Sequence, residues 1–214
     1  MNLLLEDYID SHTSPEPANL RKLERDSHLH RINGRMCSGH LQGRMLKMLA
    51  AMAAPMRALE LGTFTGYSAL CLAEGLPDGG RLTTVEVFDE LEAPIRRALE
   101  QSPWGDRVDL VIDDAEHFCA LQPDESFDLI FIDADKRRYP EYLAECKRIL
   151  APGGVIIADN TLWDGHVTEP DRNDPQTAGI KRFNDMAVAD PDLECVIMPM
   201  RDGMTLLRKR NPEL

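Results

Sequence analysis

The sequence predicts a fold of the α/β class, in which helices cover both faces of a mostly parallel, doubly wound sheet. Short apolar runs alternate with segments of helical spacing along most of the chain, which is the order expected of repeated strand and helix units. Turn signals such as Pro77–Gly80 separate these units. The length of 214 residues suits one doubly wound domain, and no linker divides the chain. We therefore expect a single domain over residues 1–214.

The most informative stretch is Arg57–Ser68, which reads RALELGTFTGYS. An apolar run typical of a buried strand is followed by Gly62 and Gly66 and then by helical spacing, so the glycines occupy a turn. A ligand would bind there, outside the carboxyl end of the strand. The dinucleotide pattern GxGxxG would need a glycine at Phe64, and the acidic Glu60 is poorly suited to phosphate, so a pyrophosphate cofactor is disfavoured. On these residues alone, an ordinary turn without a ligand is an equal alternative.

Composition and charge restrict the classes of function. Hydrophobic residues make up 43% of the chain, enough for a full core, and no apolar run approaches the roughly 20 residues of a bilayer span. The N-terminus carries Glu6, Asp7 and Asp10 in place of a basic leader, so we expect a cytoplasmic protein without a secretory signal. The net charge of −13 disfavours nucleic acid and anionic membranes as partners. Five cysteines without a CxxC pair fit free thiols.

The first 54 residues are predicted to form helices that precede the sheet, with a break at Ser14–Pro17. Gly34–Gly43 is rich in small residues and is expected to be a loop that leads into an amphipathic helix over Arg44–Ala53. Residues 55–214 then form the α/β core.

The second strand is expected over Arg81–Val87, with Glu86 at its carboxyl end. This acid lies a little over 20 positions beyond the first glycine of the turn, where related folds bind a ribose diol through one carboxylate. A solvated acid at a strand end is the alternative. The elements that follow are expected as a helix over Phe88–Gln101, a strand over Arg107–Ile112, a loop over Asp113–Ala115 and a helix over Glu116–Leu121.

Acidic residues follow two buried strands in the second half of the chain. Phe127–Ile132 ends at Asp133, and Val155–Ala158 ends at Asp159 and Asn160. Because one helix separates these strands, we expect them to be neighbours with both carboxyl ends at the same sheet edge. Two carboxylates and an amide oxygen suit Mg²⁺ or a similar divalent ion. Acids often cap single strands, but three such groups on adjacent strand ends favour a site.

The last part of the chain begins with a polar loop, Leu162–Gly179, whose length indicates that it is either functional or mobile. Trp163 at its base is predicted to form a wall for a flat substrate or, equally, a buried anchor. A helix over Ile180–Ala189 and two strands, Leu193–Met198 and Gly203–Arg208, follow. Their short spacing predicts a terminal antiparallel pair.

The chain resembles the cation-dependent O-methyltransferases of the catechol and caffeoyl-coenzyme A type from Met36 to Arg208. Four motifs carry this resemblance: LELGTFTGYS at 59–68, FIDADKRRYPEY at 131–142, ADNTLWDGHV at 158–167 and MRDGMTLLRK at 200–209. The resemblance implies a Rossmann-like fold of seven strands, with the last strand antiparallel, that binds S-adenosylmethionine (SAM). It also implies methyl transfer to one hydroxyl of a vicinal diphenol chelated by Mg²⁺.

The resemblance also assigns roles to individual residues. The predicted cofactor site has Met36 over the sulfonium, Gly62, Phe64, Gly66 and Ser68 around the methionine part, Glu86 at the ribose and Ala115 beside the adenine. It also includes Glu60 and Asp133. The metal ligands are Asp133, Asp159 and Asn160, and Lys136 is the proposed base. Trp163, Lys136 and Asn160 are predicted to contact the methyl acceptor. The chain departs from the family at Asp114, where a glycine is usual.

Three functions fit these residues. The first is SAM-dependent methylation of a small aromatic acceptor, with a homodimer expected only by analogy. The second is methylation of a hydroxylated tRNA base, against which the net charge of −13 argues. The third is a non-catalytic, cofactor-binding regulatory protein. Retention of Asp133, Asp159, Asn160 and Lys136 argues against that third function.

Overall fold

In the computed structural model, which describes residues 3–30 and 34–211, seven strands form one sheet in the order β3-β2-β1-β4-β5-β7-β6. The strands are β1 (Arg57–Leu61), β2 (Arg81–Glu86), β3 (Val108–Ile112), β4 (Phe127–Ile132), β5 (Leu150–Asp159), β6 (Leu193–Met198) and β7 (Met204–Lys209). Strands β1 to β5 pair in parallel, whereas β7 runs antiparallel to both β5 and β6. The predicted doubly wound sheet with an antiparallel last strand is confirmed.

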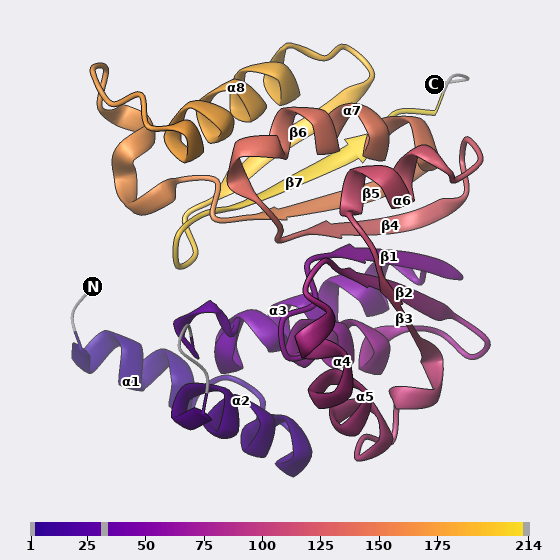
Figure 1. Ribbon diagram of the computed structural model, residues 1–214. Helices are drawn as coiled ribbons and strands as arrows, with labels where there is room; N and C mark the ends of the chain where they lie inside the picture. Colours follow the sequence, from indigo (N-terminus) through magenta and orange to yellow (C-terminus); the bar gives the residue numbers. More distant parts are fainter. Residues whose placement is uncertain (1–2, 31–33, 212–214) are drawn as a thin grey trace.

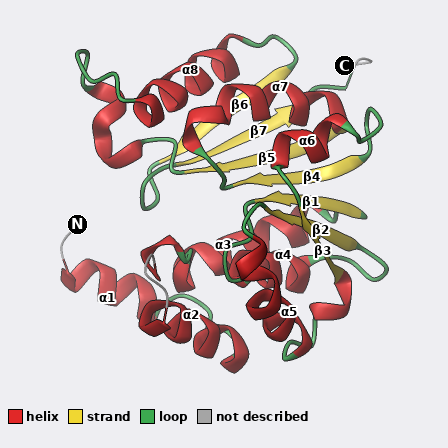
Figure 2. Cartoon of the chain, viewed as in Figure 1, coloured by secondary structure: helices red, strands yellow, loops and turns green. Residues whose placement is uncertain are grey.

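Helices lie on both faces of the sheet (Figure 1). They are α1 (Leu3–Ser11), α2 (Ala18–His30), α3 (Gly39–Ala53), α4 (Tyr67–Gly75), α5 (Glu92–Glu100), α6 (Ala115–Ala120), α7 (Tyr139–Ile149) and α8 (Pro175–Ala189). Helices α6, α7 and α8 cover one face, and α3, α4 and α5 cover the other, with α1 and α2 outside α3 (Figure 2). Each face has its own apolar cluster, because side chains of the buried strands alternate between the two faces.

Helix α3 begins five residues earlier than the sequence predicted, because Gly39–Gly43 is its first part and not a loop. The glycine at 43 is explained by helix packing. A Cβ there would lie 2.8 Å from Cys71 Sγ and from the Tyr67 hydroxyl on α4. The small residue therefore marks a close approach of two helices and not a break in one.

Helix α8 also begins five residues before its predicted start, so the expected polar loop ends at Asp174. Asp174 caps the helix by accepting the backbone N–H of Thr177 at 3.0 Å, and Pro175 occupies the first turn. Gly179 lies inside the helix, where a Cβ would come within 2.3 Å of the Lys136 carbonyl oxygen. Here again the glycine permits a close contact.

Two smaller differences concern the sheet-flanking segments. The predicted helix at Phe88–Gln101 is a 3-10 turn, Asp89–Leu91, followed by the shorter α5. Strand β5 is longer than the predicted strand Val155–Ala158, because it also includes residues 150–154, where its pairing with β4 shifts register. Residues 1–2 and 31–33 of the predicted N-terminal helical segment lie outside the described residues. Across residues 3–30 and 34–211, no helix combines the length and apolar character needed to cross a membrane.

Candidate active site

The sequence-predicted site residues lie mostly at the carboxyl edge of the parallel strands. The segment after β5 and the hairpin between β6 and β7 both lie on the left in Figure 1, above α1 and α3. In the central strands, the register pairs Leu61 with Ile132 and Ile132 with Ala158, so β1, β4 and β5 end side by side. The loops that follow these three strands therefore meet at one edge.

The glycine turn after β1 packs directly on the loop after β4. Gly62 has a φ of +94°, and a Cβ at this position would lie 2.2 Å from the Asp133 carbonyl oxygen. Gly66, with a φ of +86°, is the N-cap of α4. Phe64 also has a positive φ, of +52°, which is unusual for a bulky residue. Glycine is thus required at 62 both by backbone conformation and by space.

Glu86 holds the glycine turn in place. Its carboxylate accepts the backbone N–H of Phe64 at 2.8 Å and that of Thr63 at 3.3 Å through Oε2, and that of Phe88 at 3.0 Å through Oε1. The side chain is almost fully buried. The sequence predicted a ribose ligand at this position, and the structure adds a bracing role for the turn. The two N–H groups occupy the lone-pair sites of Oε2, and Oε1 keeps one site for a further donor.

Glu60 is a fully buried acid in β1, one residue before the strand ends. Burial, supported by the charges of Asp133 and Glu86, raises the pKa of its carboxyl group from 4.5 to about 8. Oε2 accepts the Thr84 hydroxyl at 2.5 Å. Within the described part of the chain, Oε1 has no hydrogen-bond partner. A buried, unpaired carboxylate oxygen next to the glycine turn suits a positively charged ligand group.

Asp133 and Asp159 end the neighbouring strands β4 and β5, as the sequence predicted. Burial raises the pKa of Asp159 from 3.8 to about 6, and the charge of Asp133 adds to this shift. Asp159 Oδ1 accepts the backbone N–H of Asn160 at 2.8 Å, and Asn160 has a φ of +59°. A cation would offset the repulsion that Asp159 experiences from Asp133, and the set of hard oxygen donors fits Mg²⁺.

No group of three or more His, Cys, Asp or Glu side chains suited to a metal gathers among residues 3–30 and 34–211. The predicted metal set contains only two such side chains, with the Asn160 amide as the third donor. Its assignment as a metal site therefore stays a prediction.

Lys136 lies in the 3-10 turn Lys136–Arg138 and points toward the strand ends. Its Nζ donates to Asp133 Oδ1 at 2.6 Å and to the Tyr139 hydroxyl at 2.8 Å. Lys136 does not form a surface pair with its neighbour Asp135, because Asp135 binds Arg137 and Lys136 is partly buried. Lys136 thus joins Asp133, Asp159 and Asn160 in what we call the strand-end cluster. Its predicted role as a base requires this position.

The other predicted site residues are placed less centrally. Ser68 and Ala115 are buried in the first turns of α4 and α6. Asp114, at the departure from the family pattern, caps α6 by accepting the N–H groups of Glu116 and His117. Met36 is 56% exposed in the 3-10 turn Gly34–Met36.

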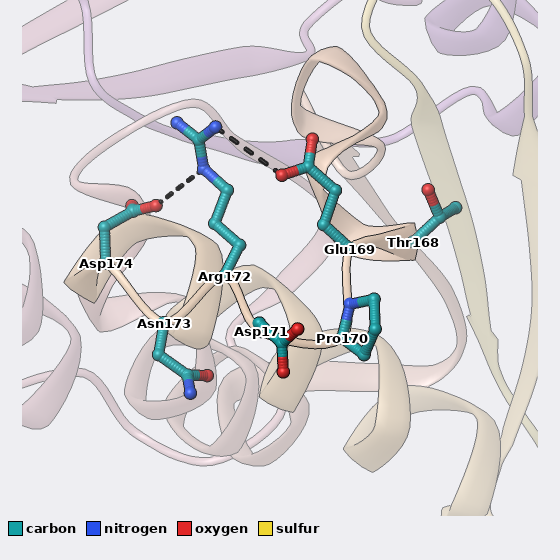
Figure 3. A pocket seen from close by; sticks show the side chains of 7 residues that line it. All are labelled: Thr168, Glu169, Pro170, Asp171, Arg172, Asn173 and Asp174. Atoms are coloured by element: carbon teal, nitrogen blue, oxygen red, sulfur yellow. Dashed lines mark hydrogen bonds and ion pairs between the residues drawn. The ribbon is translucent and has the colours of Figure 1, made fainter.

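Trp163 is partly buried and packs against the apolar cluster under α6, α7 and α8. This placement agrees with the anchor alternative, and the substrate-wall alternative stays a prediction. Further along the same segment, Thr168–Asp174 line an open hollow of about 770 Å³ (Figure 3). Arg172 crosses this hollow to Asp174 at 3.0 Å and Glu169 at 3.7 Å. None of the predicted site residues lines the hollow.

Sequence reasoning missed three residues that contact the predicted site. The Tyr139 hydroxyl, fully buried, donates to the Asp159 carbonyl at 2.9 Å and accepts from Lys136. Gln42 Nε2 donates to Asp159 Oδ2 at 2.6 Å, and Arg201 Nη1 donates to Gln42 Oε1 at 2.9 Å. Gln42 carries no local signal, and the quoted motif at 200–209 contains Arg201 without indicating its partner, since these partners lie more than 100 positions away. Tyr139 stands within a quoted motif and could have been found from its spacing to Lys136.

The structure is a doubly wound α/β fold with acidic side chains at one sheet edge, and comparison with known proteins shows the family. A family model described as O-methyltransferase matches residues 10–210, and the chain belongs to this O-methyltransferase family. A catechol O-methyltransferase from Niastella koreensis is 35% identical over 173 residues, which cover 77% of this chain and 78% of the relative. Caffeoyl-CoA O-methyltransferase 2 from Zea mays is 30% identical and covers 91% of this chain and 77% of its own length.

A solved structure of an O-methyltransferase has the same fold as this chain and contains the cofactor SAM. The O-methyltransferase TomG from Streptomyces achromogenes, in complex with SAM, superposes with a TM-score of 0.90 at 29% identity, covering 97% of this chain and 96% of that one. The family resemblance, the fold and the enzyme class are thereby confirmed. The SAM-bound relative supports SAM as the methyl donor.

Proposed function

We propose that this O-methyltransferase uses SAM and a divalent cation to methylate one hydroxyl of a small vicinal diphenol. The observation that carries the proposal is the meeting of Asp133, Asp159, Asn160 and Lys136 beside the glycine turn, at one edge of the sheet. The catechol and caffeoyl-CoA activities of the relatives support the same class of acceptor.

The residues at the glycine turn fit the cofactor. Gly62 and Gly66 give the turn its positive-φ backbone, and Glu86 Oε1 keeps a lone-pair site for a ribose hydroxyl. Glu60 offers a buried oxygen, without a partner among the described residues, to the ammonium group of the methionine part. A cation beside a buried acid offsets part of the desolvation cost of the carboxylate, which is highest when the charge has no partner.

Methyl transfer forms a bond between the acceptor oxygen and the methyl carbon and breaks the bond from that carbon to sulfur, which leaves S-adenosylhomocysteine and a proton. Asp133, Asp159 and Asn160 would hold the cation, which supplies positive charge to stabilise the ionised hydroxyl. Lys136, fixed by Asp133 and Tyr139, is in place to take the proton or to stabilise the oxyanion. Most of the acceleration would come from aligning the reacting atoms.

The test is incubation of the purified protein with labelled SAM and Mg²⁺, together with either a panel of catechols or bulk tRNA. We expect label in a catechol, loss of turnover in excess chelator, and recovery when Mg²⁺ is added back. Label in tRNA alone would replace the acceptor by a hydroxylated base, and SAM binding without transfer to any acceptor would indicate a regulatory protein. Full activity in excess chelator would remove the cation from the proposal.

A variant pair connects the assay to the predicted ligands. Asp159→Ala should abolish turnover or raise the Mg²⁺ requirement while circular dichroism shows an intact fold. The control is Asp185→Ala, which removes an exposed carboxylate on α8 and should behave as wild type. Equal Mg²⁺ requirements in the two variants would exclude Asp159 as a ligand.

A further inference from the structure

Gln42 connects three segments that are distant in sequence. It lies in the first turn of α3, and its side chain is 1% exposed. Its Nε2 donates to Asp159 Oδ2 at 2.6 Å, and its Oε1 accepts from Arg201 Nη1 at 2.9 Å. Arg201, in the hairpin between β6 and β7, also donates to the Cys37 carbonyl oxygen at 3.4 Å. The amide of Gln42 thus joins α3 to the end of β5 and to the last hairpin, and Arg201 extends this connection to the segment before α3.

The orientation of this amide is set by its partners. A guanidinium only donates hydrogen bonds, so it must face the amide oxygen of Gln42. The amide nitrogen is then directed at Asp159, where the carboxylate oxygen accepts its proton. Because Arg201 excludes the flipped amide, the donor to Asp159 is always the same atom. Arg201 therefore acts on Asp159 through Gln42.

The two donors on Asp159 restrict how its carboxylate can turn. Asn160 N binds Oδ1 at 2.8 Å and Gln42 Nε2 binds Oδ2 at 2.6 Å. An ionised carboxylate has about four lone-pair sites, so each oxygen keeps one for another partner. A side chain held at both oxygens loses little further freedom when it binds an ion, which lowers the entropic cost of binding.

We propose that Gln42 is a positioning residue that holds the Asp159 carboxylate ready for a divalent cation, with Arg201 fixing the direction of its amide. The inference rests on the proposed cation dependence of the enzyme. It assigns to α3 and the last hairpin a part in cation affinity, although neither supplies a predicted ligand.

The test uses Gln42→Met, which keeps the length and approximate volume of the side chain and removes the donor. The matched control is Gln101→Met, at an exposed glutamine after α5. Binding of Mn²⁺ is measured by electron paramagnetic resonance on the whole chain without cofactor or methyl acceptor. We expect Gln42→Met to bind Mn²⁺ roughly 10- to 100-fold more weakly, the usual effect of losing a partner of a metal ligand, and the control to match wild type.

A second readout separates positioning from simple structural support. If Gln42 positions Asp159, Gln42→Met raises the Mg²⁺ concentration needed for half-maximal rate at least about tenfold, and saturating Mg²⁺ restores most of kcat. A merely structural role would lower the thermal midpoint and leave the Mg²⁺ requirement unchanged, which would overturn the inference. Should Gln42→Met not fold, Arg201→Met decides, because it leaves the amide without its orienting donor. Unchanged Mn²⁺ affinity in that variant also overturns the inference.

The outcomes for wild type keep the two proposals apart. A wild-type chain that neither binds Mn²⁺ nor needs a cation for turnover contradicts the proposed function itself. A wild-type chain that binds Mn²⁺ as tightly as its Gln42→Met and Arg201→Met variants contradicts only the positioning role of Gln42.

Discussion

Replacing Glu60 by glutamine should change how the stability of the cofactor-free protein depends on pH. In the unfolded chain this carboxyl group ionises near its usual pKa of 4.5, whereas in the fold burial raises the pKa to about 8. Between these values the folded chain holds a proton that the unfolded chain has released. The contribution of Glu60 to stability is therefore complete below pH 4.5, falls as pH rises through this window, and is lost above pH 8.

The size of the effect follows from the pKa values. One pKa unit corresponds to about 1.4 kcal/mol, so a rise from 4.5 to about 8 gives an upper limit of about 5 kcal/mol for a fully buried group. Glutamine does not titrate, and its oxygen can still accept the Thr84 hydroxyl. Its buried NH₂ group would lack a partner near the position of Oε1, at a cost of about 1–3 kcal/mol at every pH. We thus expect the variant to be less stable than wild type at pH 5 and at least as stable at pH 8.5.

The assay is urea unfolding of wild type and Glu60→Gln between pH 5 and 8.5, with the exposed Glu100→Gln as the control. The measured quantity is the difference in unfolding free energy between each variant and wild type. For Glu60→Gln this difference should shift by several kcal/mol in favour of the variant as pH rises, and for Glu100→Gln it should stay flat. A constant difference for Glu60→Gln, within about 0.5 kcal/mol, would show that Glu60 is not held protonated in the fold.

Three further substitutions test the site. Lys136→Ala should lower kcat roughly 10²-fold or more while calorimetry shows nearly unchanged SAM affinity, and Lys136→Arg should be similarly impaired. A near-normal kcat for Lys136→Ala from pH 6 to 9 would exclude the base role. Glu86→Ala should weaken SAM binding in calorimetry and leave Mn²⁺ affinity within about twofold of wild type, because its carboxylate braces the glycine turn and not the strand-end acids. Unchanged SAM affinity would remove Glu86 from the cofactor site. Gly179→Ala should lower the free energy of unfolding by about 1–3 kcal/mol in a thermal assay and lower kcat, since the new Cβ meets the Lys136 carbonyl oxygen at 2.3 Å. Wild-type behaviour in both assays would contradict the close packing of α8 on the turn that contains Lys136.

The strands and the strand-end acids were predictable because they depend on local signals. An apolar run such as Phe127–Ile132 specifies a strand buried on both faces, and the residue that follows it falls at the sheet edge. Sequential strands joined by one helix are usually neighbours, which was enough to bring Asp133 and Asp159 together. For these residues, strands that follow one another along the chain are also neighbours in the sheet.

The errors share one physical cause, which is contact between distant segments. Gly43 and Gly179 were interpreted as loop residues, yet both lie inside helices because another segment passes too close for a Cβ. Gln42 and Arg201 were overlooked for the same reason, since only the folded chain shows their bonds to each other and to Asp159. Helix propensity and motif spacing describe neighbours along the chain and contain no term for such contacts.

The hydrogen bonds of Lys136 decide what its side chain can do for methyl transfer. An ammonium group has three N–H donors and no acceptor, and Asp133 Oδ1 and the Tyr139 hydroxyl take two of these donors at 2.6 and 2.8 Å. Among the described residues no acceptor takes the third, so it is available to the oxygen of a methyl acceptor. In this form Lys136 would stabilise negative charge on that oxygen but could not receive its proton, and the proposed base role requires that Lys136 first lose a proton. Arginine keeps its charge at any working pH, so a Lys136→Arg enzyme within a few-fold of the wild-type kcat would refute the base role and leave charge stabilisation as the function of this residue.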